Sequence, residues 1–212
     1  MQAVARWAGT CAPVFGAVDA ANALFAAAAL GVRERGVVEA LVAAVARDPP
    51  AAFPAAAHGV LLAHFAGLGV GLAHDVLGGL WEVGVGGAPG DAGGGALTPV
   101  QHEVCQTLQA LGYSVQPKVE LLEGLVRADM LASMPSTGGW DGGEAKRFCV
   151  FVDPPACFLS GGVVPTASTV LRGRVVRATF QGKMIAISEA AWQALEPAAR
   201  VELLTERLGW SN

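Results

Sequence analysis

A glycine-rich segment at residues 84–95 is the feature that most constrains how this chain can fold. Ordering so many glycines has a high cost in conformational entropy, so the segment is predicted to be a flexible linker without regular structure. It is no phosphate-binding loop, because no Lys follows it at the required spacing. We therefore predict α-helical repeats over residues 1–83, a linker over residues 84–97 and a small mixed-sheet α/β domain over residues 98–212.

The composition excludes several classes of protein. Hydrophobic residues occupy 53% of the 212 positions and charged residues only 15%, which is too apolar for a disordered chain. Four cysteines are too few for a disulfide scaffold and lack zinc-site spacing, so we expect buried thiols in a reducing or organellar compartment. No run of 18 apolar residues suits a membrane span, and we expect no membrane partner.

The first half shows helical periodicity and an internal match. Leu24 and the pair Leu30-Gly31 correspond to Leu62 and the pair Leu68-Gly69, an offset of 38 residues. Each copy is predicted as a helix closed by Leu-Gly and followed by a second helix, at residues 36–46 and 73–81. Two-helix units of this length are typical of α-solenoids. A chance match in a sequence rich in Ala, Leu and Gly is the alternative.

The second half alternates between helix and strand patterns. Thr98 and Pro99 are a good N-cap and first-turn pair for a helix that reaches residue 111. The β-branched and aromatic run at residues 147–153 favours a buried strand. This order indicates a mixed sheet with helices packed on it. Further extended segments are expected at residues 113–122, 126–132 and 183–187, and further helices at residues 168–179 and 188–208.

Positive charge is concentrated after the linker. The formal net charge is −4, and only four of the fourteen Lys and Arg residues precede residue 99. Guanidinium groups bind phosphate oxygens and stack on exposed bases, so a local basic patch favours RNA. A solvated helix face is the alternative. The candidate RNA-binding residues are Arg172, Arg174 and Arg177 on one predicted helix, joined by Lys183, Lys146 and Arg147.

Several motifs of the second half carry a family resemblance. They are a helix ending in Leu111-Gly112, a strand around Asp129, a strand leading into Asp153-Pro154-Pro155, a basic helix at residues 169–174, and a terminal pattern from Ile185 to Trp192. In this order they resemble a RAP domain, an RNA-binding module of organellar proteins whose fold is similar to that of restriction endonucleases. The 38-residue period upstream is similar to the octotricopeptide repeats that often precede this module.

The chain departs from the family at positions that matter for chemistry. Phe151 replaces a Glu, Pro154 replaces a Gly, and Cys157 stands where a His would lie. Asp129 and Asp153 match nuclease-like positions on adjacent strands, but Phe151 removes a third ligand for a divalent cation, and no Lys follows two residues later. We therefore predict that these three positions are vestigial, with no tight metal site, cofactor or cleavage. Pairing of either aspartate with a neighbouring Arg is the alternative reading.

The resemblance implies a non-catalytic protein of organellar RNA metabolism. It would bind single-stranded mRNA or rRNA in a chloroplast or mitochondrion and act on transcript stability, processing or translation. Three alternatives stay open: a scaffold subunit of an organellar ribosome or other ribonucleoprotein particle, a metal-dependent nuclease, and an interaction domain that binds no nucleic acid. Residues 1–15 contain one Arg and no acid, a pattern typical of a transit peptide and also of the interior of a longer protein.

Overall fold

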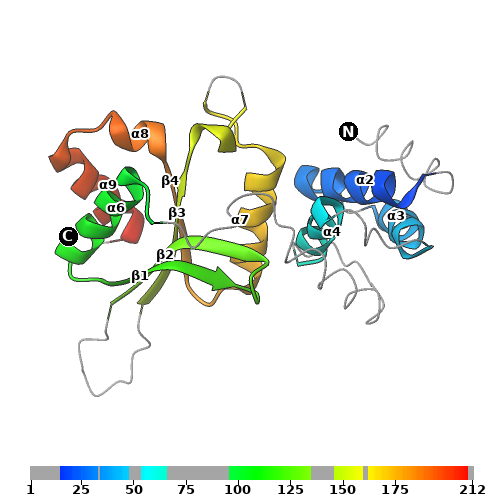
Figure 1. The fold of residues 1–212 in the computed structure, drawn as a ribbon, viewed down its shortest axis with the longest axis horizontal. Helices are drawn as coiled ribbons and strands as arrows, with labels where there is room; N and C mark the ends of the chain where they lie inside the picture. The colour runs from blue at the N-terminus through cyan, green and yellow to red at the C-terminus, as the bar shows by residue number, and fades with distance from the viewer. Residues whose placement is uncertain are drawn as a thin grey trace, which may run out of the picture. The chain divides into compact units, whose positions relative to one another are not determined.

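The chain is a mixed α/β protein. The computed structural model describes residues 15–32, 34–47, 54–65, 96–134, 146–159 and 162–209. These residues contain seven α-helices and a four-stranded mixed sheet, with helices in the N-terminal part and the sheet in the C-terminal half (Figure 1). This confirms the predicted arrangement of an α-helical N-terminal part followed by a mixed-sheet C-terminal half. The described elements belong to two compact units, and each unit is described here by itself.

The first unit is a group of helices that meet through small side chains. Helix α2 (Ala17–Leu30) packs against α3 (Arg35–Arg47) and α4 (Pro54–Phe65). A Cβ atom on Gly59 of α4 would lie 3.3 Å from Cδ2 of Phe25 on α2, so the two helices approach closely there. Small residues permit this approach while still burying apolar surface. Its buried alanines include Ala20, Ala21, Ala27, Ala28, Ala44, Ala56, Ala57 and Ala63.

The Leu-Gly end predicted for the first helix is confirmed. Gly31 is the C-cap of α2 with φ of 72°, a left-handed conformation that glycine adopts without steric cost. The backbone N–H of Gly31 donates to the carbonyl of Ala28, and that of Val32 to the carbonyl of Ala27. The corresponding pair of the second predicted copy, residues 68–69, and its helix at 73–81 lie outside the described residues, as do linker residues 84–95.

Helix α7 (Ala167–Thr179) groups with this first unit, although we predicted it as part of the second domain. Its partners in the unit are α2 and α4, and residues 122–125 belong to the same unit. Contacts between segments so far apart in the chain leave no local pattern in the sequence. The predicted domain boundary itself stays a prediction, because most of the linker is outside the described residues.

The second unit contains the sheet. Its strands are β1 (Ser114–Leu121), β2 (Val126–Met134), β3 (Lys146–Asp153) and β4 (Lys183–Ser188), and they lie in that order. Strands β1, β2 and β3 pair antiparallel, whereas β3 and β4 pair parallel, with Phe148 opposite Lys183. Because β3 and β4 run in the same direction, both begin at the same end of the sheet.

Three helices cover one face of this sheet: α6 (Pro99–Ala110), α8 (Glu189–Gln193) and α9 (Pro197–Leu208) (Figure 1). Thr98 caps α6 as predicted and forms a capping box with Gln101. One core joins the helices to alternate strand residues. Its members include Val104, Leu108, Met130, Phe148, Val150, Ile185, Ile187, Trp192, Leu204 and Leu208.

The single terminal helix predicted over residues 188–208 is two helices. Ser188 caps the first, α8, as predicted, but α8 ends at Gln193. A second helix, α9, begins with Pro197 in its first turn. Proline has no backbone N–H to continue the earlier helix, and its fixed φ suits a helix start, so the chain breaks before it.

A polar contact fastens α6, α8 and α9 to one another. The indole N–H of buried Trp192 donates to Oε2 of Glu103 at 3.1 Å, and Nη1 of Arg200 lies 2.7 Å from the same oxygen. The guanidinium of Arg200 also lies 5.6 Å from the centre of the Trp192 ring, and its Nε donates to the carbonyl of Leu195. One carboxylate of α6 therefore holds a side chain from each of the other two helices.

We expect Glu103→Ala to lower the free energy of unfolding by about 1–2 kcal/mol, because the buried indole N–H of Trp192 loses its acceptor. Urea denaturation followed by tryptophan fluorescence measures this change. Glu202→Ala, at an exposed position of α9, is the matched control and should stay within about 0.5 kcal/mol of the parent chain. Equal effects of the two substitutions would contradict the assigned role.

Candidate nucleic-acid interface

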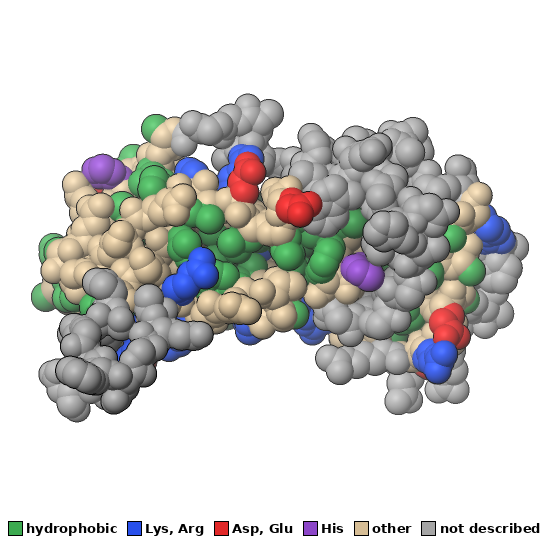
Figure 2. Space-filling view, turned by 90° about the horizontal axis from the view of Figure 1, so that it is seen from below, with side chains coloured by type: hydrophobic (Ala, Val, Ile, Leu, Met, Phe, Trp, Pro, Cys, Tyr) green, Lys and Arg blue, Asp and Glu red, His purple; other side chains and the backbone are tan. Residues whose placement is uncertain are grey.

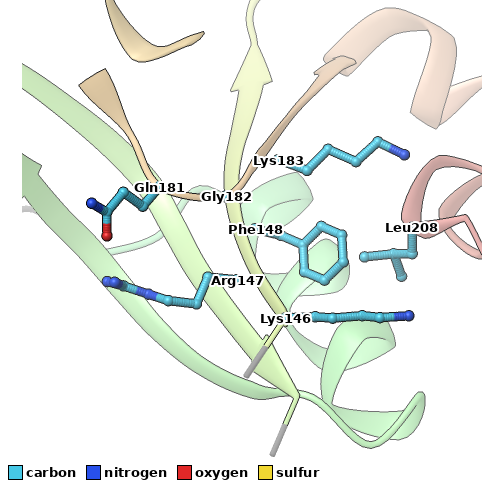
Figure 3. A pocket seen from close by; sticks show the side chains of 7 residues that line it. All are labelled: Lys146, Arg147, Phe148, Gln181, Gly182, Lys183 and Leu208. Carbon is cyan, nitrogen blue, oxygen red and sulfur yellow. The ribbon is translucent and has the colours of Figure 1, made fainter. Parts of the chain in front are cut away.

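Three of the six predicted RNA-binding residues lie around one cavity of the second unit. Lys146 and Arg147 begin β3 and Lys183 begins β4, so the parallel pairing of these strands brings the three together. The cavity has a volume of about 680 Å³. Its lining residues, all labelled in Figure 3, are Lys146, Arg147, Phe148, Gln181, Gly182, Lys183 and Leu208.

The charges around this cavity are accessible. Lys146, Arg147 and Lys183 are all exposed, and none of them forms an ion pair with an acidic residue in the described part of the chain. The floor, in contrast, contains Phe148 and Leu208, which are almost fully buried. The cavity therefore combines cationic side chains with an apolar floor. This combination suits a ligand that carries both anionic and flat apolar parts.

The cationic side chains point to two different sides. Figure 3 shows the side chains of Lys146 and Lys183 extending to the same side as Phe148 and Leu208, while Arg147 and Gln181 extend to the other. Alternation along β3 explains the separation, since neighbouring residues of a strand face opposite sides. Lys183 lies beside the end of α9, because a Cβ atom on Gly209 would be 3.8 Å from its Nζ atom. A cation is favourable at a helix C-terminus.

Arg147 makes a further contact on its own side. Its guanidinium carbon lies 5.6 Å from the centre of the Phe180 ring, within the range of a cation–π interaction. Phe180 follows α7 directly and is half-buried, whereas Arg147 and Gln181 are exposed. The aromatic ring thus supports the arginine while the side chain remains open to solvent.

Gly182 permits the two strand starts to meet. A Cβ atom at this position would lie 2.5 Å from the backbone carbonyl oxygen of Arg147 and 2.6 Å from the ring of Phe180. The ring could move, but the backbone of β3 is held in the sheet. Only glycine therefore fits the turn that leads into β4.

Gly182→Ala is expected to lower the free energy of unfolding by about 1–3 kcal/mol, because the added methyl group forces the backbone apart. Gly36→Ala is the control, since no atom lies within 4 Å of its added Cβ atom and alanine favours the helix α3. Thermal unfolding monitored by circular dichroism compares the two. If Gly182→Ala were as stable as Gly36→Ala, the close approach would be refuted.

The other three predicted residues, Arg172, Arg174 and Arg177, lie on α7 in the first unit. Nη1 of Arg174 donates to the carbonyl oxygen of Ala28 near the end of α2, and the guanidinium lies against Gly31. Arg174 therefore satisfies a carbonyl at the C-terminus of a helix. Arg172 is half-buried, and Arg177 is exposed. The six cations divide equally between the two units.

Basic side chains do not merge into one broad surface on the face seen in Figure 2. The described Lys and Arg side chains stand apart there among apolar and neutral ones, and some lie next to acidic groups. A site for an anion in this protein would therefore rest on a local cluster of cations rather than on overall charge, which is −4.

Asp129, one of the predicted vestigial positions, is held by three neighbours. Its Oδ1 atom accepts from Nε2 of Gln101 at 2.7 Å, and its Oδ2 atom accepts from the backbone N–H of Val152 at 2.7 Å. Nζ of Lys118 lies 3.6 Å from Oδ1 and donates to Oε1 of Gln101. The Asp129 carboxylate on β2 thus contacts α6, β1 and β3. Its cationic neighbour Lys118 is not an arginine, the residue type that the alternative interpretation of the sequence proposed.

The other two vestigial positions are buried in β3. Phe151 is almost fully buried and supplies no oxygen ligand, while Asp153 is buried at the end of the strand, opposite Ser188 of β4. Among the described residues no group of three or more His, Cys, Asp or Glu side chains is placed to hold a metal ion. The oxygens of Asp129 already accept hydrogen bonds, so they are poorly placed to ligate a cation.

Asp129→Ala should lower the free energy of unfolding by about 2–4 kcal/mol, because a buried backbone N–H and the Gln101 amide lose a charged acceptor. Asp129→Asn keeps one oxygen acceptor and should cost less. Chemical denaturation measures both variants, and a cleavage assay with Mg²⁺ or Mn²⁺ accompanies it. Unchanged stability together with loss of a metal-dependent cleavage activity would instead assign Asp129 a catalytic role.

Two of the three described cysteines are buried thiols, as predicted. Cys105 and Cys149 are buried and Cys157 is half-buried, and all three are free thiols. Burial raises the pKa of the Cys105 thiol, so this group stays protonated and inert at neutral pH.

Sequence reasoning missed the residues that complete the cavity. Gln181 precedes β4 in a short turn, and Leu208 comes from α9, far along the chain. Phe180, which does not line the cavity, contacts Arg147 beside it. The one sequence signal that could have indicated them is that Phe180 and Gly182 lie within three residues of the predicted Lys183. Neither a family model nor a curated protein matches the sequence. None of the described helices is long and apolar enough to cross a membrane.

Proposed function

We propose that this protein binds single-stranded RNA without cleaving it, and that its C-terminal part is a RAP-like domain with a restriction-endonuclease-like fold. The observation that carries the proposal is the cluster of Lys146, Arg147 and Lys183 around one cavity with an apolar floor. Cationic groups contact phosphates, and apolar or aromatic surface receives unstacked bases. Arg172 and Arg177 on α7 remain further candidates for phosphate contact.

The N-terminal helices support a repeat-like reading of the first unit. Helices α2 and α3 form a hairpin, and α4, which contains Leu62, the residue matched to Leu24 of α2, packs directly on α2. Contact between equivalent helices of successive units is how octotricopeptide-like repeats would stack. Action on organellar transcripts, in a chloroplast or mitochondrion, rests on the family resemblance alone.

The chemistry of the sheet favours binding over cleavage. The Asp129 carboxylate is used to hold α6, β1 and β3 together, and Phe151 occupies the place of a third cation ligand. A nuclease of this class needs several free oxygen ligands around a divalent metal ion.

A scaffold subunit of a ribonucleoprotein particle is the second candidate. One observation favours it: Leu159, Val163 and Val164 lie close together in the chain after β3 and are 55%, 83% and 57% exposed. Exposed apolar side chains grouped in this way are common at protein-binding sites.

The double substitution Lys146→Ala with Lys183→Ala should weaken RNA binding about tenfold at moderate salt and reduce the salt slope by about 1.4, since two phosphate contacts are lost. Fluorescence anisotropy with a labelled single-stranded oligonucleotide, repeated over a salt series, measures both quantities.

Arg35→Ala with Arg127→Ala removes the same charge at exposed, ion-paired positions outside the cavity and serves as the control. Equal losses in the two double variants would show that overall charge, rather than the cavity, governs binding. Co-sedimentation with ribonucleoprotein particles in the absence of any affinity for free RNA would favour the scaffold.

A further inference from the structure

The cavity at the start of β3 and β4 has two chemically different sides. On one side the side chains of Lys146 and Lys183 flank the apolar floor, and on the other Arg147 and Gln181 extend together (Figure 3). A ligand that carried charge alone would need only the lysine side. The second side offers a planar guanidinium and an amide, which are groups suited to a flat, hydrogen-bonding partner.

Arg147 is held in a way that suits stacking. Its guanidinium lies over the Phe180 ring at 5.6 Å, and the residue remains exposed. A guanidinium in cation–π contact with an aromatic ring is restrained on that side and can receive a flat group on its other face. Gly182 lies so close to the backbone of β3 that an added Cβ atom would be 2.5 Å from the carbonyl oxygen of Arg147, and this close approach places the turn with Gln181 beside Arg147.

We propose that Arg147, Phe180 and Gln181 form a nucleobase subsite, in which one base stacks on the Arg147 guanidinium and hydrogen-bonds to the Gln181 amide while Lys146 and Lys183 hold phosphates. This inference rests on the proposed RNA binding and adds the division of the site into a base side and a phosphate side. The amide of Gln181 supplies one acceptor and two donor hydrogens, which matches the edge of an unpaired base.

The subsite selects single strands over duplexes. In a duplex both faces of every base are covered by its neighbours, so no base is free to stack on Arg147. A single strand can turn one base out onto the platform while its phosphates reach the lysines. Duplex RNA would therefore engage only the lysine side.

The test compares three ligands by competition anisotropy: a single-stranded RNA oligonucleotide, an RNA duplex, and inorganic polyphosphate, which carries phosphates without bases. Arg147→Lys keeps the positive charge and removes the planar group. It should weaken binding of the single strand about five- to tenfold, the scale of one lost stacking contact, while polyphosphate and duplex affinities change less than about twofold. Arg35→Lys, the same exchange at an exposed residue of α3, should change no affinity.

Gln181→Ala is a second variant, and because Gln181 is exposed and lies outside the strands, its substitution should leave the sheet intact. This variant should also weaken binding of the single-stranded RNA selectively. Lys146→Ala with Lys183→Ala should weaken all three ligands. Equal losses for RNA and polyphosphate in Arg147→Lys, or no loss in either Arg147→Lys or Gln181→Ala, would overturn the nucleobase subsite and leave RNA binding intact. Failure of the unmodified protein to bind any RNA would overturn the proposed function itself.

Discussion

The carboxylate of Asp129 is the interaction on which the second unit depends. It lies opposite Lys118, between the paired residues Pro117–Met130 and Val119–Ala128, and it accepts from Gln101 and from the backbone of Val152. Gln101 is also the residue that closes the capping box of α6. One partly buried charge therefore sets the start of a helix, the register of an edge strand and the position of β3. A group committed to so many structural contacts is poorly suited to bind a metal ion.

That framework determines where the candidate site forms. With β3 held against β2, the parallel strand β4 aligns its first residue with Phe148, and Lys183 comes beside Lys146 and Arg147. Gly182 allows the turn before β4 to close on the carbonyl of Arg147. The end of α9 then supplies Leu208 to the floor. The cavity is thus a consequence of strand direction and one close backbone contact.

Local patterns predicted most of the elements. The Thr98-Pro99 start of α6, the Gly31 end of α2, the Ser188 cap and the four strands are each encoded by neighbouring residues. Long-range contacts escaped prediction. Nothing near Arg174 in the sequence indicates that it reaches Ala28, which is 146 residues away, and nothing near Lys118 indicates that it faces Asp129.

The predicted site was incomplete for the same reason. Charge alone pointed to Lys146, Arg147 and Lys183, but the apolar and amide groups that would give the site its selectivity come from a turn and from a distant helix. Mapping the contact directly is the clearest test of the account. A photoreactive single-stranded RNA should cross-link within residues 146–148 and 180–183, identified by mass spectrometry of the cross-linked peptides. Cross-links confined to other segments, or none at all, would contradict it.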